Sequence, residues 1–383
     1  MPPDWSFITV RDSRNYGLSE AQCDAAFPRL WSDIERGLAY RKEVGNITVE
    51  DMELNWRQEA VVRAMIYDHQ LYVLDVKGCS PRRDLRERAL AVLLSINRAV
   101  TSYTGPLPNI EFTFCVDDWA YHSLLDENSK PVTWGFTRLP DWDDVWIMPD
   151  FGYWSWPAEP VGEYSQVRTG MRLQEAGRRA TTDEELQHSR KKTLRSFRDK
   201  KPKVVWRGAL ITEQRQRLID LWENKPWSDI HGFDWGAPDH KSKYVKMMDH
   251  CQWQYVLHTE GNSYSGRLKY LQNCHSVPVI PELMWQEAHH GLLVSSGDSQ
   301  NYVQVRADYE DLGEKIEYYL ANPIEAERIA DNNVRTFRDR YLTPAAQACY
   351  WRKLIRAWRE ISFEPELLDE EGNMRGMPFE TYV

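Results

Sequence analysis

The sequence has 383 residues, of which 42% are hydrophobic and 28% are charged, and its formal net charge is −10. This length exceeds what one hydrophobic core usually serves, so we expect two domains. The overall acidity argues against nucleic acid as a partner. None of the six cysteines has the CxxC spacing of a zinc site, and one or two disulfides are expected if the protein is secretory.

No run of about 18 apolar residues occurs, so the sequence predicts no transmembrane helix. The first residues, MPPDWSFITVRDSRNYG, lack the basic region and following apolar segment of a signal peptide. We therefore expect either a cytosolic protein or one whose natural N-terminus lies upstream of this chain.

Helices and short strands are mixed in the first half of the chain. Residues 18–44 are predicted to be helical with a break at Pro28. Residues 52–76 begin polar and end in the β-rich LYVLDV, whereas 82–103 form an amphipathic helix. Residues 110–118, IEFTFCVDD, predict a strand that ends in two aspartates.

A basic segment, RKKTLRSFRDKKPK, covers residues 190–203 and follows a capping box from Thr182 to Glu185. We interpret it as a solvated helix face, with a role beside an acidic ligand as the alternative. Because no Gly/Ser-rich linker is found, we place the domain boundary at Lys203.

The second half alternates more regularly between strands and helices, which predicts a parallel sheet covered on both faces. The predicted strands are 202–210, 252–260, 276–280 and 301–305, and the predicted helices are 213–225, 266–274 and 308–323. We place the N-cap of the last of these helices at Asp308 and its end at Pro323. A final helix, 343–361, has Thr343 as its N-cap and Pro344 in its first position.

The loop in HTEGNSYSGRLKYL, residues 258–271, has the chemistry of an anion site. Gly261 and Gly266 let the backbone approach a ligand, and Ser265 can donate a hydroxyl proton. Arg267 stands in the first helical turn, where a cation opposes the helix dipole unless a bound anion such as a diphosphate compensates. The alternative is an ordinary turn with an exposed arginine. The loop matches neither GxGxxG nor a P-loop, which disfavours a dehydrogenase or an NTPase.

The same segment belongs to an ordered series of motifs. The others are PNIEFTFCVDDWA (108–120), WIMPDFGYWSWP (146–157), KVVWRGAL (203–210), NYVQVRADYEDLGEKIEYYLANP (301–323) and CYWRKLIRAW (349–358). In this order they resemble glycosyltransferase family 90, the CAP10-like, KDEL-motif or Rumi-type glycosyltransferases, in the manner of the fungal members. The resemblance covers roughly residues 105–360.

The resemblance implies an α/β chain with the GT-B fold, meaning two Rossmann-like domains with an interdomain cleft and a C-terminal helix that crosses back. We accordingly expect an acceptor-side domain with the catalytic base at 1–203 and a nucleotide-sugar-binding domain at 204–342. The returning helix and a tail would occupy 343–383.

The implied reaction is inverting transfer of a sugar, xylose or glucose, from a UDP-sugar to a hydroxyl of a glycan or glycoprotein acceptor. It implies no cofactor and no obligatory metal. The family works in the secretory pathway, so the ER or Golgi lumen is the implied location. Membrane association is expected only if an N-terminal anchor is missing from this chain.

The family's transfer base is an aspartate at the end of a strand, and the matching position here is Asp118, with Asp117 as the alternative. One base must take the proton of the attacking acceptor hydroxyl. Adjacent strand residues point to opposite faces, so we do not expect both carboxylates to act together.

WRG matches the family's nucleotide-contacting arginine, here Arg207, and Gly208 would let the backbone approach the ligand. The match of the loop to the family's motif implies that the diphosphate is contacted by Ser265, Gly266 and Arg267. Lys269 is expected to contribute less because it faces solvent, whereas Leu268, Tyr270 and Leu271 are expected to pack the helix in place.

Other interpretations stay open. The aromatic cluster Tyr153, Trp154 and Trp156 could form an acceptor-side wall or pack in the core. Asp141 and Asp143 form a DxD pattern, which would fit a metal-dependent transferase but is short and common. A glycoside hydrolase would share aromatic platforms and paired carboxylates without needing the arginines. A catalytically inactive, carbohydrate-binding relative is the remaining alternative.

Overall fold

The computed structural model describes residues 5–79, 82–120, 132–156, 161–175, 197–234, 236–238 and 240–383. The predicted capping box and the first half of the basic segment 190–203, residues 190–196, lie outside these residues. The chain divides into two compact units: unit 1 comprises Met1–Trp156, Trp285–Leu292 and Arg340–Val383, and unit 2 comprises Pro157–Met284 and Leu293–Asp339. The predicted helix 343–361 therefore belongs to unit 1.

Unit 1 contains a mixed six-stranded sheet in the order β13-β2-β1-β3-β4-β5. Its strands are β1 (Val61–Tyr67), β2 (Gln70–Lys77), β3 (Ile110–Cys115), β4 (Thr133–Gly135), β5 (Val145–Ile147) and β13 (Met377–Pro378). β1 pairs antiparallel with β2 and β3, whereas β3, β4 and β5 are parallel. The parallel half fits the expectation of a Rossmann-like sheet, and the antiparallel half does not.

The hairpin β1–β2 was only half predicted. Asp68 and His69 form its two-residue turn with positive φ of 47° and 61°, as the right-handed twist of a hairpin favours. The sequence of β1 was not identified as a strand, because it carries Arg63 among its apolar residues. That guanidinium is bonded to Glu111 of β3 at 2.6 Å and to Glu53 at 2.8 Å.

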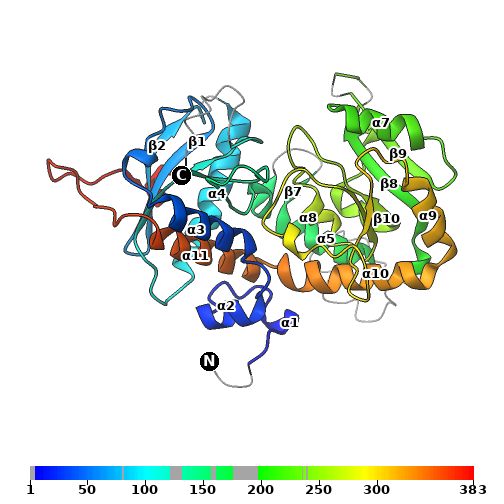
Figure 1. Ribbon diagram of the computed structural model, residues 1–383, viewed down its shortest axis with the longest axis horizontal. Coiled ribbons are helices and arrows are strands. Elements are labelled where there is room, and N and C mark those ends of the chain that lie inside the picture. The colour runs from blue at the N-terminus through cyan, green and yellow to red at the C-terminus, as the bar shows by residue number, and fades with distance from the viewer. Residues whose placement is uncertain are drawn as a thin grey trace. The chain divides into compact units, whose positions relative to one another are not determined.

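Helices accompany the sheet of unit 1, and several of them lie against it (Figure 1). They are α1 (Thr9–Asp12), α2 (Glu20–Ala26), α3 (Ser32–Val44), α4 (Arg83–Thr101), α11 (Pro344–Glu360) and α12 (Phe379–Tyr382). Thr343 caps α11 by accepting from the Ala346 amide at 3.3 Å, and Pro344 is its first residue, as predicted. Trp358 of α11 is buried and packs edge-on against Trp134, with ring centroids 5.5 Å apart.

Unit 2 is built on a parallel five-stranded sheet in the order β12-β11-β10-β8-β9. Its strands are β8 (Lys201–Ala209), β9 (Ser228–Phe233), β10 (Trp253–Leu257), β11 (Val277–Pro281) and β12 (Val303–Val305). Buried side chains of these strands pack with those of the surrounding helices in one hydrophobic cluster. The predicted parallel sheet is confirmed, and the architecture is Rossmann-like α/β.

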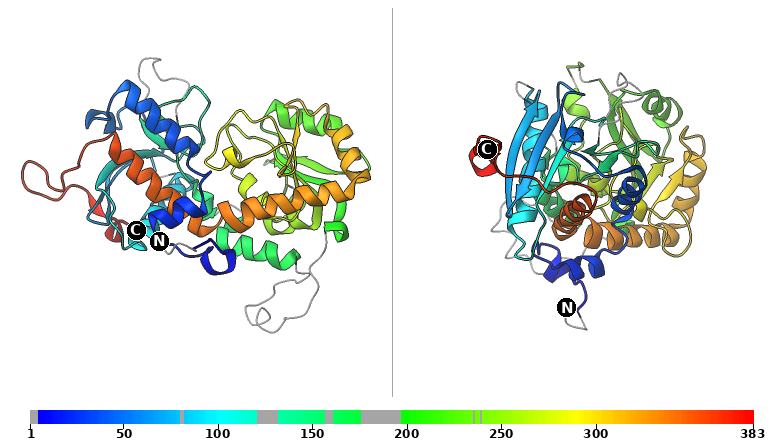
Figure 2. Two further views of the ribbon diagram at one scale, coloured as in Figure 1. Left: turned by 60° about the horizontal axis from the view of Figure 1, so that its bottom comes forward. Right: turned by 60° about the vertical axis from the view of Figure 1, so that its left-hand side comes forward.

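Among the residues described, the helices of unit 2 are α5 (Tyr164–Glu175), α7 (Glu213–Trp222), α8 (Leu268–Leu271), α9 (Leu312–Ala321) and α10 (Pro323–Thr336). The long helix α10, orange in Figure 2, packs against β11. The N-cap of α9 is Asp311 instead of the predicted Asp308. The Asp308 carboxylate instead accepts from the Glu310 amide at 3.1 Å. Pro323 begins α10 and does not only end the preceding helix.

Unit 2 begins earlier than the domain boundary expected at residue 203, because α5 is tied into its core. Lys200, next to β8, is buried and bonds Glu175 of α5 at 2.9 Å. Arg168 of α5 donates to Asn273 at 2.9 Å. Two further short strands are β6 (Ser155–Trp156) and β7 (Gly162–Glu163). No helix among the residues described combines the length and apolar character that crossing a bilayer requires.

Two disulfides form, one in each unit. Cys23 of α2 bonds Cys349 of α11, and Cys251 bonds Cys274. The other two cysteines, Cys79 and Cys115, are buried thiols. Burial raises the pKa of Cys79 to about 12 and that of Cys115 to about 11, so both thiols stay protonated at neutral pH.

We predict that Cys251→Ser/Cys274→Ser destabilises unit 2. The bond closes a ring with a sequence separation of 23 that contains β10, the loop after it and α8. Opening such a ring costs about 3 kcal/mol in the free energy of unfolding. Chemical denaturation measures the loss, and Cys79→Ser, which removes a thiol without opening a ring, is the control. Equal stability of the double variant and the native chain would contradict the prediction.

Candidate active site

The strand order of unit 2 defines a switch point between β8 and β10. β9 lies on one side of β8 while β10, β11 and β12 lie on the other. In open parallel sheets, ligands bind beyond the carboxyl ends of the strands at such a point. Arg207 and Gly208 lie near the end of β8, and the loop 258–267 follows β10.

Direct contacts join these two strand ends. Arg267 Nη1 donates to the carbonyl of Arg207 at 2.5 Å. Trp206 Nε1 donates to the Thr259 hydroxyl at 3.2 Å. The structure therefore brings together Arg207 and the loop that carries Ser265, Gly266 and Arg267, as the sequence predicts for a nucleotide site.

Arg207 is held by an acidic partner that sequence reasoning missed. Its Nη2 lies 2.5 Å from Asp229 Oδ1, and Trp253 Nε1 donates to the other carboxylate oxygen at 2.8 Å. Burial opposes ionisation of Asp229, but the bond and charge of Arg207 lower its pKa below the usual value. Arg207 also lines a cavity of about 310 Å³ together with His231 and Tyr244.

Gly208 is required by packing as well as by ligand access. A Cβ atom built on it would lie 2.5 Å from the Trp206 ring, closer than carbon atoms approach. The short helix α8 covers only part of the predicted helix 266–274, and Arg267 is its N-cap residue.

Lys269 differs from the prediction. Instead of facing solvent it is fully buried, and its Nζ donates to the Gly266 carbonyl at 2.5 Å. Its ammonium therefore stabilises the turn of the loop. The neighbouring Leu268, Tyr270 and Leu271 are buried, which confirms their predicted packing role.

The loop lies in a positive electrostatic environment. Burial, and after it the charge of Arg215, lower the pKa of Arg267 to about 9. Burial also lowers the pKa of His250 to about 4, and the charges of Arg267 and Arg207 act in the same direction. At neutral pH the arginines are cations and His250 is neutral, so a bound anion would relieve the repulsion between the cations.

In unit 1 the two aspartates have different partners. β3 ends at Cys115, so Asp117 and Asp118 lie in a bend beyond the strand, and the predicted alternation of faces does not apply to them. Asp117 is paired with the buried Arg57 and accepts from the Asp118 amide at 2.7 Å. Asp118 pairs with Arg88 at 2.9 Å, and 40% of its side chain is exposed.

The aromatic cluster lies on the Arg88 side of Asp118. Arg88 stands over the Phe151 ring at 4.8 Å, and Phe151 packs edge-on against Trp156 at 5.6 Å. Trp154 stacks with Arg98 at 3.8 Å. Tyr153, Trp154 and Trp156 are all half-buried, so each combines packing with an accessible surface.

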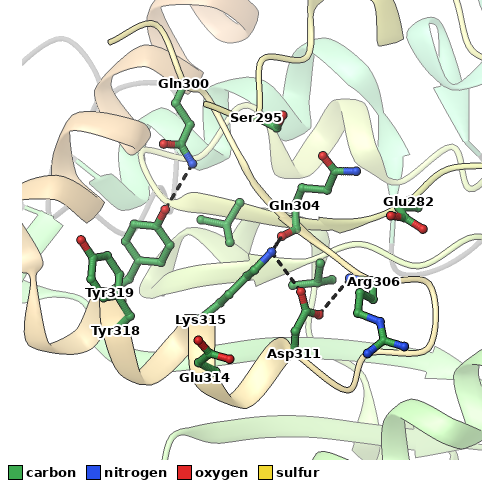
Figure 3. A pocket seen from close by; sticks show the side chains of 12 residues that line it. Glu282, Ser295, Gln300, Gln304, Arg306, Asp311, Glu314, Lys315, Tyr318 and Tyr319 are labelled. Carbon is green, nitrogen blue, oxygen red and sulfur yellow. Dashed lines mark hydrogen bonds and ion pairs between the residues drawn. The ribbon is translucent and has the colours of Figure 1, made fainter. Parts of the chain in front are cut away.

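A second cavity of unit 2, about 500 Å³, runs along the sheet edge between β12 and α9. Figure 3 shows Lys315 of α9 extending to the Gln304 carbonyl of β12, 2.5 Å away, and to Asp311 at the start of its own helix, 3.0 Å away. β12 lies two strands from β10, so this cavity is separate from the switch point.

One group among the residues described has metal-binding side chains in proximity. Potential ligand atoms of Glu287, His289 and His290 lie within 4.8 Å of one another. Both ring nitrogens of His290 already contact Glu287, its amide at 3.2 Å and its carboxylate at 2.9 Å. The group is therefore a buried turn whose His290 ring is already hydrogen-bonded within it.

Comparison with known proteins gives related sequences. The chain is 27% identical over 268 residues to the O-glucosyltransferase rumi homolog of Aedes aegypti, and this alignment covers 67% of the chain and 62% of that protein. It is 30% identical over 139 residues to the O-glucosyltransferase LpsA of Dichelobacter nodosus, covering 36% and 43%. It is 23% identical over 283 residues to human Protein O-glucosyltransferase 1, covering 70% and 66%.

The aligned regions thus span less than two thirds of the length of each of these relatives. The model of the family described as "Glycosyl transferase family 90" matches residues 19–371, which include every candidate site residue named above. The predicted resemblance is confirmed, and the chain belongs to glycosyltransferase family 90.

Proposed function

We propose that the chain is an inverting glycosyltransferase that moves a sugar from a UDP-sugar to a hydroxyl of a glycan or protein acceptor. The observation that carries this proposal is the convergence of Arg207 and the Ser265–Arg267 segment at the switch point of unit 2. The names of the relatives specify O-glucosyl transfer, which favours glucose over xylose as the donated sugar.

The diphosphate of the donor is assigned to the loop after β10. Arg267 and Arg207 supply two cations, and Ser265 supplies a hydroxyl group. Gly208 and Gly266 allow the backbone to approach the diphosphate closely. Negative charge grows on UDP as the glycosidic bond breaks, so cations fixed at that point stabilise the transition state. The arginines would thereby do what a metal ion does in metal-dependent transferases.

Asp118 is assigned as the base. Its carboxylate would take the proton of the acceptor hydroxyl while that oxygen attacks the anomeric carbon and UDP leaves with the bonding electrons. Asp117 suits this role less, because Arg57 and the Asp118 amide occupy its two oxygens. Arg88 would hold the Asp118 carboxylate in one orientation through its hydrogen bond.

The wider arrangement follows from the same proposal. Units 1 and 2 would be the acceptor-side and nucleotide-side domains of a GT-B transferase. The two disulfides favour an oxidising compartment, such as the ER or Golgi lumen.

We predict that Asp118→Asn lowers the transfer rate by about 10²- to 10⁴-fold, since the amide cannot accept the proton. UDP binding, measured by calorimetry, should stay unchanged because the loop after β10 is intact. Glu43→Gln, at an exposed carboxylate of the same unit outside the candidate site, serves as the control. Full transfer activity in Asp118→Asn would refute the assignment of the base.

Arg267→Ala should weaken UDP binding by about tenfold to a hundredfold, the effect of losing one charge-assisted hydrogen bond. The shift of the melting temperature with UDP concentration measures this loss. Arg328→Ala removes a partly exposed arginine of α10 and should leave UDP binding as it is. Unchanged affinity in Arg267→Ala would place the diphosphate elsewhere. A glycoside hydrolase would show no stabilisation by UDP at all.

Removing divalent metal with EDTA should leave transfer unchanged. In the DxD pattern, Asp143 is paired with Arg36 at 3.4 Å and so is already engaged with a cation. Transfer assays with EDTA and with added Mn²⁺ check this expectation. Loss of activity in EDTA that Mn²⁺ restores would show that a metal, and not the arginines alone, neutralises the diphosphate.

A further inference from the structure

We propose that Arg215, which the sequence motifs do not identify, is a positioning residue for the diphosphate, acting through the two strand ends at the switch point. This inference rests on the proposed function, because it assigns the residue to the same nucleotide site. Arg215 lies in the first turn of α7 and only 6% of its surface is exposed.

The side chain bridges β8 and the loop after β10. Its Nε donates to the Glu260 carbonyl at 2.8 Å, and its Nη1 donates to the Ala209 carbonyl at 3.0 Å. Ala209 is the last residue of β8, and Glu260 follows the end of β10 by three residues. One guanidinium therefore fixes the separation of the two chain segments between which the diphosphate is assigned.

The loop also passes directly over this guanidinium. A Cβ atom built on Gly261 would lie 3.4 Å from Arg215 Nη2, and the Gly261 amide donates to the Ser263 carbonyl at 2.8 Å. Arg215 thus fixes the start of the loop through its contact with the Glu260 carbonyl. Lys269 fixes the other end of the loop through the Gly266 carbonyl. The rigid planar fork of arginine can make these divergent bonds, whereas lysine presents a single point charge.

Arg215 contributes charge as well as geometry. Its side-chain hydrogen bonds go to carbonyl groups, and within the described part of the chain it forms no ion pair with a carboxylate. Burial lowers its pKa to about 10, and its charge in turn lowers the pKa of Arg267. Two buried guanidinium groups close together favour an anion between or beside them.

A merely structural arginine would differ in one measurable respect. If Arg215 only stabilised unit 2, its loss would lower the affinities for UDP and for uridine to the same extent, or would change neither affinity. If it positions the diphosphate loop, its loss weakens the binding of UDP. The binding of uridine, which has no phosphate, stays unchanged. The ratio of the two affinities therefore separates the roles.

The experiment is calorimetric titration of the full chain with UDP and with uridine, using Arg215→Gln and Arg215→Lys. We expect UDP affinity to fall about tenfold or more in Arg215→Gln, since small displacements of a binding group have effects of this order or larger. Arg215→Lys should recover part of the loss because it keeps the charge. The control is Arg217→Gln, which removes a half-exposed arginine of the same helix and should change neither affinity.

Two results would overturn the inference. One is UDP affinity within twofold of the native chain in both folded Arg215 variants. The other is a parallel loss of UDP and uridine affinity. Failure of the native chain to bind UDP is a different outcome, because it overturns the proposed function on which the inference rests.

A measurement on the native chain covers the case in which the variants do not fold. Hydrogen exchange with UDP or uridine present is followed in segments 209–217 and 258–267. We expect UDP to slow exchange in both segments more than uridine does, because Arg215 couples them. Protection of 258–267 alone would refute the coupling.

Discussion

The parallel pairing of β8 with β10 is the constraint on which the candidate site of unit 2 depends. The two strands are far apart in sequence, yet their pairing brings Trp206 beside Thr259 and the Arg207 carbonyl beside Arg267. With β9 on the other side of β8, the connections leave in opposite directions and open a binding position at the strand ends. Neither the WRG motif nor the loop could form a site without this pairing.

The charge distribution around that position distinguishes ligand binding from simple packing. Arg207 has a carboxylate partner in Asp229, so its position is fixed before any ligand binds. Arg267 and Arg215 instead bond to carbonyl groups. Burying a cation against carbonyl dipoles alone costs more than burying it in an ion pair. A sequence that keeps two such cations at a strand end retains a cost that a bound diphosphate would offset.

Most elements could be predicted because their patterns are local. The helix α4 and the strands β8, β10, β11 and β12 follow from their hydrophobic patterns, whereas β9 was not predicted. Thr343 and Pro344 mark the start of α11. β1 was missed because Arg63 interrupts its apolar pattern, and only its contact with Glu111 on β3 explains a cation there. Lys269 was misjudged because helical spacing does not reveal that the loop carbonyl of Gly266 turns back onto its ammonium.

The candidate site could be predicted only in part, because contacts between residues far apart in sequence leave no local pattern. The residues expected to touch the donor stand in recognisable motifs, whereas the residues that hold them do not. Arg57 is separated from Asp117 by 60 residues and Arg88 from Asp118 by 30, so no spacing marks either pair. These partners add to the motif match, which already favours Asp118 and keeps Asp117 as the alternative. Asp117 is occupied by Arg57 and by the following amide, whereas Asp118 is more exposed and lies beside the aromatic cluster, which supports our proposal that Asp118 meets the acceptor hydroxyl.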